Sequence, residues 1–318
     1  MKTLTKKNVL ILAAILLTFG IVQAFISTGV INSFYEITIA TICINIILAV
    51  SLNLVTGFTG QFSLGHAGFM SIGAYTCAII NMHMNSTAGF LFGTLAGALI
   101  ATFVGILVGI PTLRLRGDYL AIATLGMAEI IRVLFLNMEI TNGAAGLNGI
   151  PRFTNWLWLY VFTAGTIILI NNYIKSSHGR ACISIREDEI AAESMGINTT
   201  KYKVMAFAIG AFFAGVAGAL YASYFYFIKP DLFGFLKSID ILVIVVLGGM
   251  GSLTGSVIAA VVLAVISTFL QSFTAVRMIV YAALLVMIMI FRPQGLMGTK
   301  EINDLLKFKS RKRDERIE

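Results

Sequence analysis

Long apolar runs, separated by short polar or glycine-rich breaks, follow one another along most of the chain. A run of about 18 or more apolar residues can cross a hydrocarbon core of about 30 Å as an α-helix. The pattern predicts spans at residues 9–26, 37–56, 62–82, 89–110, 119–138, 155–174, 204–227, 239–255, 256–271 and 277–291. We therefore predict an all-α polytopic membrane protein of about ten transmembrane helices.

Small residues recur three or four positions apart inside these runs, a spacing that lets helix backbones approach closely in lipid. The clearest cases are Gly89, Gly93 and Gly97, then Gly105 and Gly109, and the ladder Gly210, Ala211, Ala214, Gly215 and Gly218. We predict a tight Gly-rich bundle, in which Asn45 and Asn53 form hydrogen bonds between helices. The spacing carries no information about a substrate.

Composition agrees with a membrane protein, because 58% of the residues are hydrophobic and 12% are charged. Soluble domains have roughly 45–50% apolar and about 25% charged residues. The net charge of +8 comes largely from the basic tail 299–318 and from short loops between the predicted spans. Membrane topology accounts for this excess, so we expect contact with membrane lipid and no nucleic-acid partner.

The distribution of Lys and Arg gives an orientation, because cytoplasmic loops are enriched in both. With the N-terminus inside, the cytoplasmic side receives Lys2, Lys6, Lys7, Arg114, Arg116, Lys175, Arg180, Arg186, Lys201, Lys203, Arg292 and the tail. The outside receives Arg152, Lys229, Lys237 and Arg277. We expect a multi-pass protein of the cell inner membrane, with both termini cytoplasmic. The segment 9–26 resembles a signal peptide, but further spans follow it, so we interpret it as a retained first helix.

The sequence offers no catalytic or cofactor motif. The cysteines Cys43, Cys77 and Cys182 lie far apart and predict neither a metal site nor a disulfide framework. No Gly-Lys dipeptide occurs, so the chain has no GxxxxGK[ST] phosphate loop to bind ATP. There is also no HExxH motif and no pair of aspartates inside the spans. We predict a protein that is not an enzyme, with no cofactor of its own.

The longest polar segment, 175–203, is predicted to contain a short cytoplasmic amphipathic helix. Ser184 is placed to cap its N-terminus and Glu187 to complete a capping box, while Gly196 is placed to end it in a left-handed cap. Its apolar ridge would consist of Ile190, Ala191, Ser194 and Ile197. Such a ridge fits either a plain surface helix or a helix that docks into a groove.

Ionisable and glycine residues inside the runs are the candidates for a translocation pathway. Glu129 and Arg132 lie one turn apart in a predicted span, where we expect Glu129 near the midplane, and they form either a structural ion pair or part of the pathway. A lone histidine such as His66 is more often a packing residue than a proton relay. The glycines Gly57, Gly60, Gly65 and Gly68 permit irregular backbone, which membranes tolerate where it is buried or lines a cavity.

Several segments resemble a known family. Ala191-Ala192-Glu193 followed by Gly196 resembles the coupling loop through which ATP-binding-cassette (ABC) importer permeases dock onto their ATPases. The segments Gly57–Gly73 (GFTGQFSLGHAGFMSIG), Leu113–Arg132, Val246–Gly255 and Arg292–Gly298 are similar to the permeases of branched-chain amino acid importers, LivM-type, whose relatives handle urea, amides and ribose. The resemblance runs from about residue 40 to residue 298.

The resemblance implies a single permease domain, 1–298, with a coupling loop at 175–203. It implies a second permease subunit, two cytoplasmic ABC ATPase subunits that bind the ATP, and a periplasmic or lipid-anchored substrate-binding protein. Substrates of a urea or amide permease are an alternative within the family. Outside it, a proton-coupled secondary transporter would use Glu129 and His66 as a relay, and an intramembrane enzyme is a third class that the missing catalytic motifs weaken.

Overall fold

The computed structural model describes residues 6–29, 32–113, 115, 117–269, 283, 286, 287, 290 and 295–298. Its α-helices are α1 (Lys6–Ser27), α2 (Ser33–Asn53), α3 (His66–Met84), α4 (Thr87–Thr112), α5 (Asp118–Asn137), α6 (Trp156–Lys175), α7 (Ser177–Glu187), α8 (Glu189–Ser194), α9 (Thr199–Phe225), α10 (Phe235–Gly248) and α11 (Leu253–Phe269). Two short strands, β1 (Leu147–Asn148) and β2 (Phe227–Ile228), pair antiparallel. The predicted span 277–291 lies largely outside the described residues, as does the tail 299–318.

The apolar runs predicted most of these helices, and the chain is an all-α membrane protein. Five described segments are each long and apolar enough to cross a membrane: Ser33–Phe58, Thr87–Thr112, Asp118–Asn137, Trp156–Lys175 and Thr199–Phe225. The number of about ten spans stays a prediction.

Two predicted boundaries are wrong. The break expected between residues 255 and 256 lies instead between α10 and α11, where Gly249 and Gly251 take positive φ angles of 109° and 90°. The span expected to begin at 62 begins as helix only at His66, because the backbone before it is irregular. In both places several glycines stand close together, and the pattern alone does not say which of them breaks the helix.

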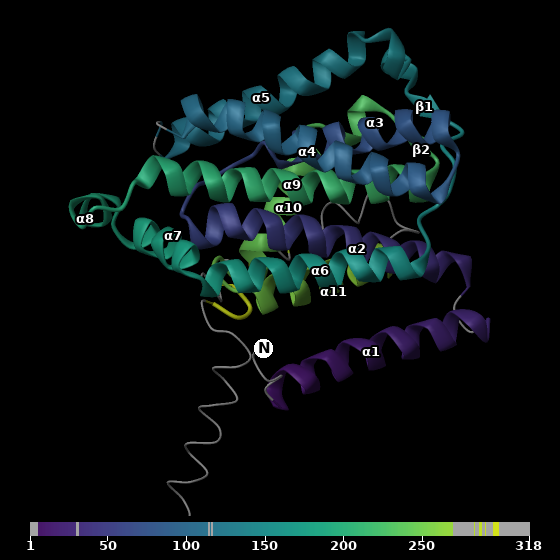
Figure 1. Cartoon of the computed structure of the whole chain (residues 1–318), viewed down its shortest axis with the longest axis horizontal. Coiled ribbons are helices and arrows are strands. Elements are labelled where there is room, and N and C mark those ends of the chain that lie inside the picture. The colour runs from purple at the N-terminus through teal and green to yellow at the C-terminus, as the bar shows by residue number, and fades with distance from the viewer. Residues whose placement is uncertain are drawn as a thin grey trace, which may run out of the picture.

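The long helices lie side by side with their connections gathered at two opposite ends (Figure 1). We call the end that carries α7 and α8 the α8 end, and the end that carries β1 and β2 the β end. Lys175, Arg180, Arg186, Lys201 and Lys203 belong to the α8 end. Arg152 and Lys229 belong to the β end, whereas Lys237 lies farther along the bundle and donates to Asn45 of α2 at 3.4 Å. These five and two residues, which the sequence assigned to opposite membrane sides, therefore lie at opposite ends of the bundle.

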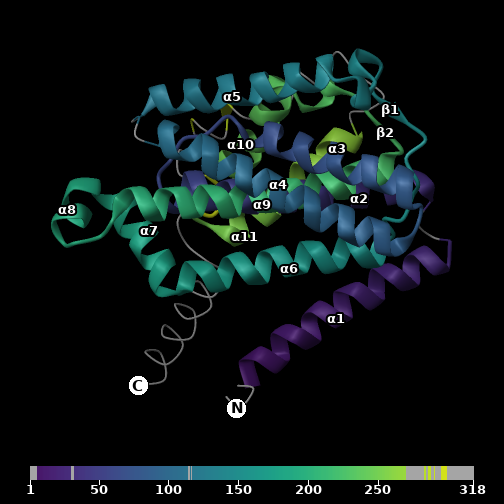
Figure 2. The same cartoon turned by 45° about the horizontal axis from the view of Figure 1, so that its top comes forward.

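Helices α3, α4 and α9 pack closely against one another, and α2 lies between this group and α6, α10 and α11. The close approach depends on glycine. A Cβ atom at Gly73 of α3 would collide with the carbonyl of Gly215 on α9, and one at Gly218 of α9 would collide with the carbonyl of Met70 on α3. Helix α1 lies outside this group, along α6, as Figure 2 shows.

We expect Gly73→Ala and Gly218→Ala each to destabilise the protein by about 1–3 kcal/mol, because the added methyl group forces the backbones of α3 and α9 apart. Gly126→Ala is the matched control, since nothing lies within 4 Å of a Cβ at that position of α5. The thermal midpoint of aggregation in detergent, followed by size-exclusion chromatography, measures the effect. Equal midpoints for all three variants would contradict the packing described here.

Candidate functional site

Two short helices, α7 and α8, project from the α8 end (Figures 1 and 2) and carry the predicted coupling residues. The hydroxyl of Ser176 accepts the Gly179 amide at 3.3 Å and caps α7. The carboxylate of Asp188 accepts the amides of Ile190 and Ala191 at 2.9 and 3.0 Å and caps α8. The amphipathic segment is thus two helices that meet at Asp188.

The predicted capping box is wrong. Ser184 lies inside α7, where its hydroxyl donates to the carbonyl of Ala181 at 2.8 Å, and Glu187 forms an ion pair with Arg186. Asp188 accepts two amides at once and is the stronger N-cap, so the new helix begins one residue after it. The side of α7 that faces the bundle carries Cys182, and burial raises the pKa of its thiol.

Helix α8 presents an apolar surface to the outside. The side chains of Ile190 and Met195 are 70% and 82% exposed, and Ala191 and Glu193 are exposed beside them. Ala192 is buried and faces the bundle. The predicted ridge therefore exists in part, with Met195 as its most exposed apolar member, which the sequence reasoning missed.

The position of α8 is fixed at both of its ends. Gly196 takes a φ of +83°, so the predicted left-handed cap is confirmed. The amides of Gly196 and Ile197 donate to the carbonyls of Glu193 and Ala192 at 2.9 and 3.1 Å, the paired bonds of a Schellman motif. Glu189, at the start of α8, forms an ion pair of 2.7 Å with Lys203 of α9.

Arg186 connects α7 with two breaks in the membrane helices. Its Nη1 donates to the carbonyl of Gly57 at 2.9 Å. A Cβ at Gly251, in the turn between α10 and α11, would lie 2.7 Å from the same Nη1, and a Cβ at Gly60 would lie 3.1 Å from its Cγ. The guanidinium group therefore contacts both glycine-rich breaks, the one at Gly57 and the one at Gly251. No local pattern in the sequence predicts this contact.

Asn53, the last residue of α2, joins the same two breaks. Its side-chain amide donates to the Ser252 carbonyl at 2.8 Å and to the Ser256 hydroxyl at 2.7 Å, and its oxygen accepts the amide of Gly251 at 2.9 Å. This confirms the predicted interhelical hydrogen bond of Asn53. Because the residue is fully buried, each bond also satisfies a group that water cannot reach.

The predicted irregular backbone at the glycine segment is confirmed. After Asn53 the chain forms a π-helix, Leu54–Phe58, and then runs without regular structure to the start of α3. Gly60 takes a φ of +74°, and Gly65 and Gly68 lie against Thr124 and Ala128 of α5. Within this segment Gln61 is 2% exposed, and neither carboxamide atom has a hydrogen-bond partner among the described residues.

His66 is a buried packing residue at the start of α3. It is 3% exposed, and its Nε2 lies 2.8 Å from the hydroxyl of Ser51 on α2. That hydroxyl donates to the carbonyl of Leu48, so the imidazole is a donor in this pair. The geometry fits the packing interpretation of this histidine.

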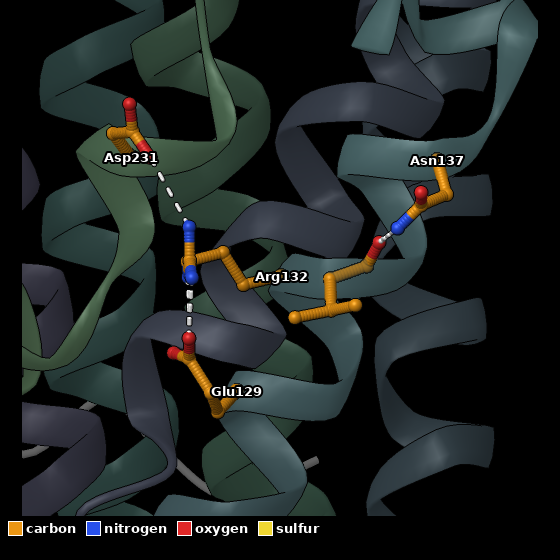
Figure 3. A network of polar contacts seen from close by, with 5 residues as sticks. Glu129, Arg132, Asn137 and Asp231 are labelled. Atoms are coloured by element: carbon orange, nitrogen blue, oxygen red, sulfur yellow. Dashed lines mark hydrogen bonds and ion pairs between the residues drawn. The ribbon is translucent and has the colours of Figure 1, made fainter. Parts of the chain in front are cut away.

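Glu129 and Arg132 form the ion pair that their spacing predicts, and Arg132 has a second partner (Figure 3). The Nε of Arg132 donates to Glu129 at 2.8 Å, and its Nη1 donates to Asp231 at 3.1 Å. Asp231 belongs to the short 3₁₀ turn Pro230–Phe233 that leads into α10 at the β end. Glu129 lies about 12 Å along the axis from the end of α5 at Asn137, and its expected position near the midplane stays a prediction.

The structure divides the predicted pathway residues into two clusters. Gly57 and Gly60 contact Arg186 at the α8 end, whereas Glu129 and Arg132 lie near the β end. Gly65 and Gly68 lie between them along α5. Over the described ranges, no group of three or more His, Cys, Asp or Glu side chains could hold a metal ion.

Residues 34–290 match a family described as the permease component of the branched-chain amino acid transport system. The chain belongs to this family. The match covers most of the chain, including the segment from Gly57 to Gly68, the helices α7 and α8, and the ion pairs of Arg132. The family resemblance inferred from the sequence motifs is thereby confirmed.

Similar permeases come from enteric bacteria. The high-affinity branched-chain amino acid transport system permease protein LivM of Salmonella typhimurium is 39% identical, over 82% of this chain and 70% of its own length. LivM of Escherichia coli is 38% identical over 92% of this chain and 76% of its own length. The permease protein LivH of Salmonella typhimurium is 24% identical over 80% of this chain and 92% of its own length. No solved structure matches the chain.

We expect Arg132→Gln to reduce the amount of folded protein by more than Glu129→Gln or Asp231→Asn, because it alone leaves two carboxylates without a counter-charge. Each single carboxylate variant keeps one ion pair and should lose less than about half of the folded protein, as for a partly exposed pair. The double variant Glu129→Gln with Arg132→Gln should recover part of the loss. Folded protein is measured as the monodisperse fraction after detergent extraction.

Glu139→Gln is the control, since Glu139 lies at the same end and forms no ion pair within the described part of the chain. Normal folding of all these variants together with lost transport would assign the cluster to the translocation pathway.

Proposed function

We propose that this chain is the permease subunit of an ABC importer for branched-chain amino acids. Its family and its similarity to LivM and LivH support this substrate class. The missing phosphate loop supports an energy source on another chain. The same family could also serve a urea or amide importer, and uptake measurements separate these substrates.

In this proposal the chain works with three kinds of partner protein. It forms half of the translocation pathway with a second permease subunit, as a heterodimer. Two cytoplasmic ABC ATPase subunits bind the ATP, one of them against α8, and a periplasmic or lipid-anchored substrate-binding protein delivers the substrate at the β end. The chain would form a Gly-rich bundle of about ten spans with both termini cytoplasmic.

The observation that carries the proposal is the exposed apolar surface of α8. Ile190 and Met195 project from a short helix whose two ends are held by the Gly196 cap and by the Glu189–Lys203 ion pair. Exposed apolar side chains such as Ile190 and Met195, on a helix held in place, are suited to bind in a groove on a partner protein. We propose that Ala191, Ala192, Glu193 and Gly196, which resemble the coupling loop of ABC importer permeases, form this docking surface.

Arg186 gives this docking surface a physical connection to the membrane helices. A displacement of α8 moves α7, to which it is joined at Asp188, and Arg186 of α7 holds the carbonyl of Gly57. We infer that the segment from Gly57 to Gly68 changes conformation during transport. The carboxamide of Gln61 has no hydrogen-bond partner among the described residues, which supports this inference, because a rearrangement that supplies a partner would recover its hydrogen-bonding energy.

Arg186→Gln should uncouple transport from ATP hydrolysis, because it removes the charged contact with Gly57 and leaves the surface of α8 intact. In vesicles that contain the complete transporter, we expect leucine uptake per ATP hydrolysed to fall by about fivefold or more, the usual size of a coupling between sites. Arg180→Gln is the matched control on α7, since Arg180 is exposed and bonds only the carbonyl of Lys175 among the described residues.

Gly196→Val tests the docking step itself, because the left-handed conformation costs a β-branched residue about 1–2 kcal/mol. Asn tolerates this conformation better, so Gly196→Asn should retain most of the association with the ATPase that Gly196→Val loses. Association is measured by co-purification. Wild-type uptake in both Gly196→Val and Arg186→Gln, or uptake driven by a proton gradient without ATP, would contradict the proposal.

A reporter fused after Ile317 should read cytoplasmic, and one inserted at Asn148 should read periplasmic. These two sides follow from the larger number of Lys and Arg residues at the α8 end than at the β end, because cytoplasmic loops are enriched in both. A pair of reporters on the same side would overturn the ten-span topology without touching the assignment of the family.

A further inference from the structure

A cavity of about 480 Å³ lies at the β end between α1, α2 and α6. Phe19 and Gln23 of α1, Glu36 and Ile39 of α2, and Trp156 of α6 line part of it. Arg152, Asn155 and Tyr224 line its polar side. No step of the proposed transport mechanism uses these residues.

An apolar groove of about 340 Å³ continues from this cavity along α2 and α6. Ile39 and Trp156 line both spaces, so the two are adjacent. The groove follows α6 from Trp156 to Ile168, which is about 18 Å at the rise of an α-helix. Its lining is almost wholly apolar, and it runs from the β end toward the middle of the bundle.

The wider cavity contains donors for an anionic group. The guanidinium of Arg152 stacks 4.6 Å from the ring of Tyr224 and donates to the hydroxyl of Tyr226 at 2.9 Å, and it forms no ion pair with any described residue. Asn155 is the N-cap of α6 without a side-chain cap bond, so the first amides of a 20-residue helix face this region.

A second, independent donor at the cavity lacks a partner. The indole Nε1 of Trp156 is buried and makes no hydrogen bond to any described residue. A buried donor without an acceptor is costly unless a ligand or water supplies one. Trp156 lines both the polar cavity and the groove, so its ring lies at their junction.

Glu36 gives the cavity a negative charge in addition to the positive charge of Arg152. It lies in the first turn of α2, lines the cavity and forms no ion pair in the described part of the chain. A ligand that fits all these features has an anionic group, a cationic group and a long apolar chain. A free branched-chain amino acid has the first two, but its side chain is too short to occupy the groove.

We propose that this cavity and groove form a binding site for one phospholipid with a primary-amine headgroup. Its phosphate lies against Arg152 and the N-terminus of α6, its ammonium group against Glu36, and one acyl chain in the groove between α2 and α6. Because the lipid bridges α1 and the bundle, it fastens the first helix to the rest of the protein. This inference rests on the membrane location of the chain and not on its substrate.

The test uses the complete transporter in vesicles of phosphatidylcholine that contain a phosphatidylethanolamine with a photoactivatable acyl chain. After illumination, mass spectrometry should locate the label on the groove segments 42–46 and 163–168. Unlabelled phosphatidylethanolamine should compete better than phosphatidylglycerol, which has the phosphate without the amine, and free leucine should not compete.

Matched variants test each part of the site. Arg152→Gln should lower labelling about tenfold, the loss of one charge-assisted hydrogen bond, whereas Lys229→Gln at the same end should not. Glu36→Gln should remove the preference for phosphatidylethanolamine over phosphatidylglycerol, and Glu139→Gln should retain it. Ala164→Phe fills the groove and should abolish labelling, while Val161→Phe, on a part of α6 outside the groove, should not.

Labelling that is uniform over the lipid-facing surface, or equal in Ala164→Phe and Val161→Phe, would overturn the proposal. Displacement of the probe by leucine would also overturn it and assign the cavity to the substrate. If the groove is instead covered by the second permease subunit, no label appears on it in the complex, and the proposal fails. Leucine uptake, measured in the same vesicles, reports on the proposed function separately.

Discussion

The side chain of Asn53 satisfies the backbone at a point where two membrane helices are broken. A bilayer supplies no water to unpaired amides and carbonyls, so every helix break at that depth needs partners from the protein. The turn between α10 and α11 obtains them from Asn53, and the π-helical end of α2 obtains one from Arg186. Both breaks therefore lie at the point where α2, α7 and the turn contact one another. This contact needs glycine, because a Cβ at Gly57 would collide with the backbone of Gly251.

The rest of the bundle is held differently. Between α3, α4 and α9, glycines bring backbones into direct contact, and a well-packed interior of this kind has few alternative arrangements. From Thr59 to Gly65 the chain has no regular hydrogen bonding, and the side chain of Gln61 there finds no partner within the described part of the chain. The close-packed group supports the fold, whereas the irregular segment is held by contacts with its neighbours and not by the hydrogen bonds of a helix.

The sequence predicted the features that repeat locally and missed those that depend on distant residues. Apolar runs predicted the helices, and Gly196 and the Glu129–Arg132 pair followed from spacing within one or two turns. The capping box failed because Asp188 competes with Ser184, and propensity alone does not rank two adjacent caps in a polar segment. The bonds of Arg186 to Gly57 and of Arg132 to Asp231 join residues 129 and 99 positions apart, which leaves no local signal.

These long-range contacts form a closed circuit. Arg186 connects α7 to the glycine segment, Gly65 and Gly68 of that segment lie against α5, and Arg132 of α5 binds the turn that leads into α10. Helix α10 ends at the break that Asn53 holds beside Arg186. A displacement that begins at α8 therefore cannot stay local, because the Gly57–Gly68 segment cannot shift without changing contacts at both ends of the bundle. Arg186 and Arg132 stand at the two ends of this circuit, and Gly65 and Gly68 lie between them against α5, where a Cβ would collide with Thr124 or Ala128.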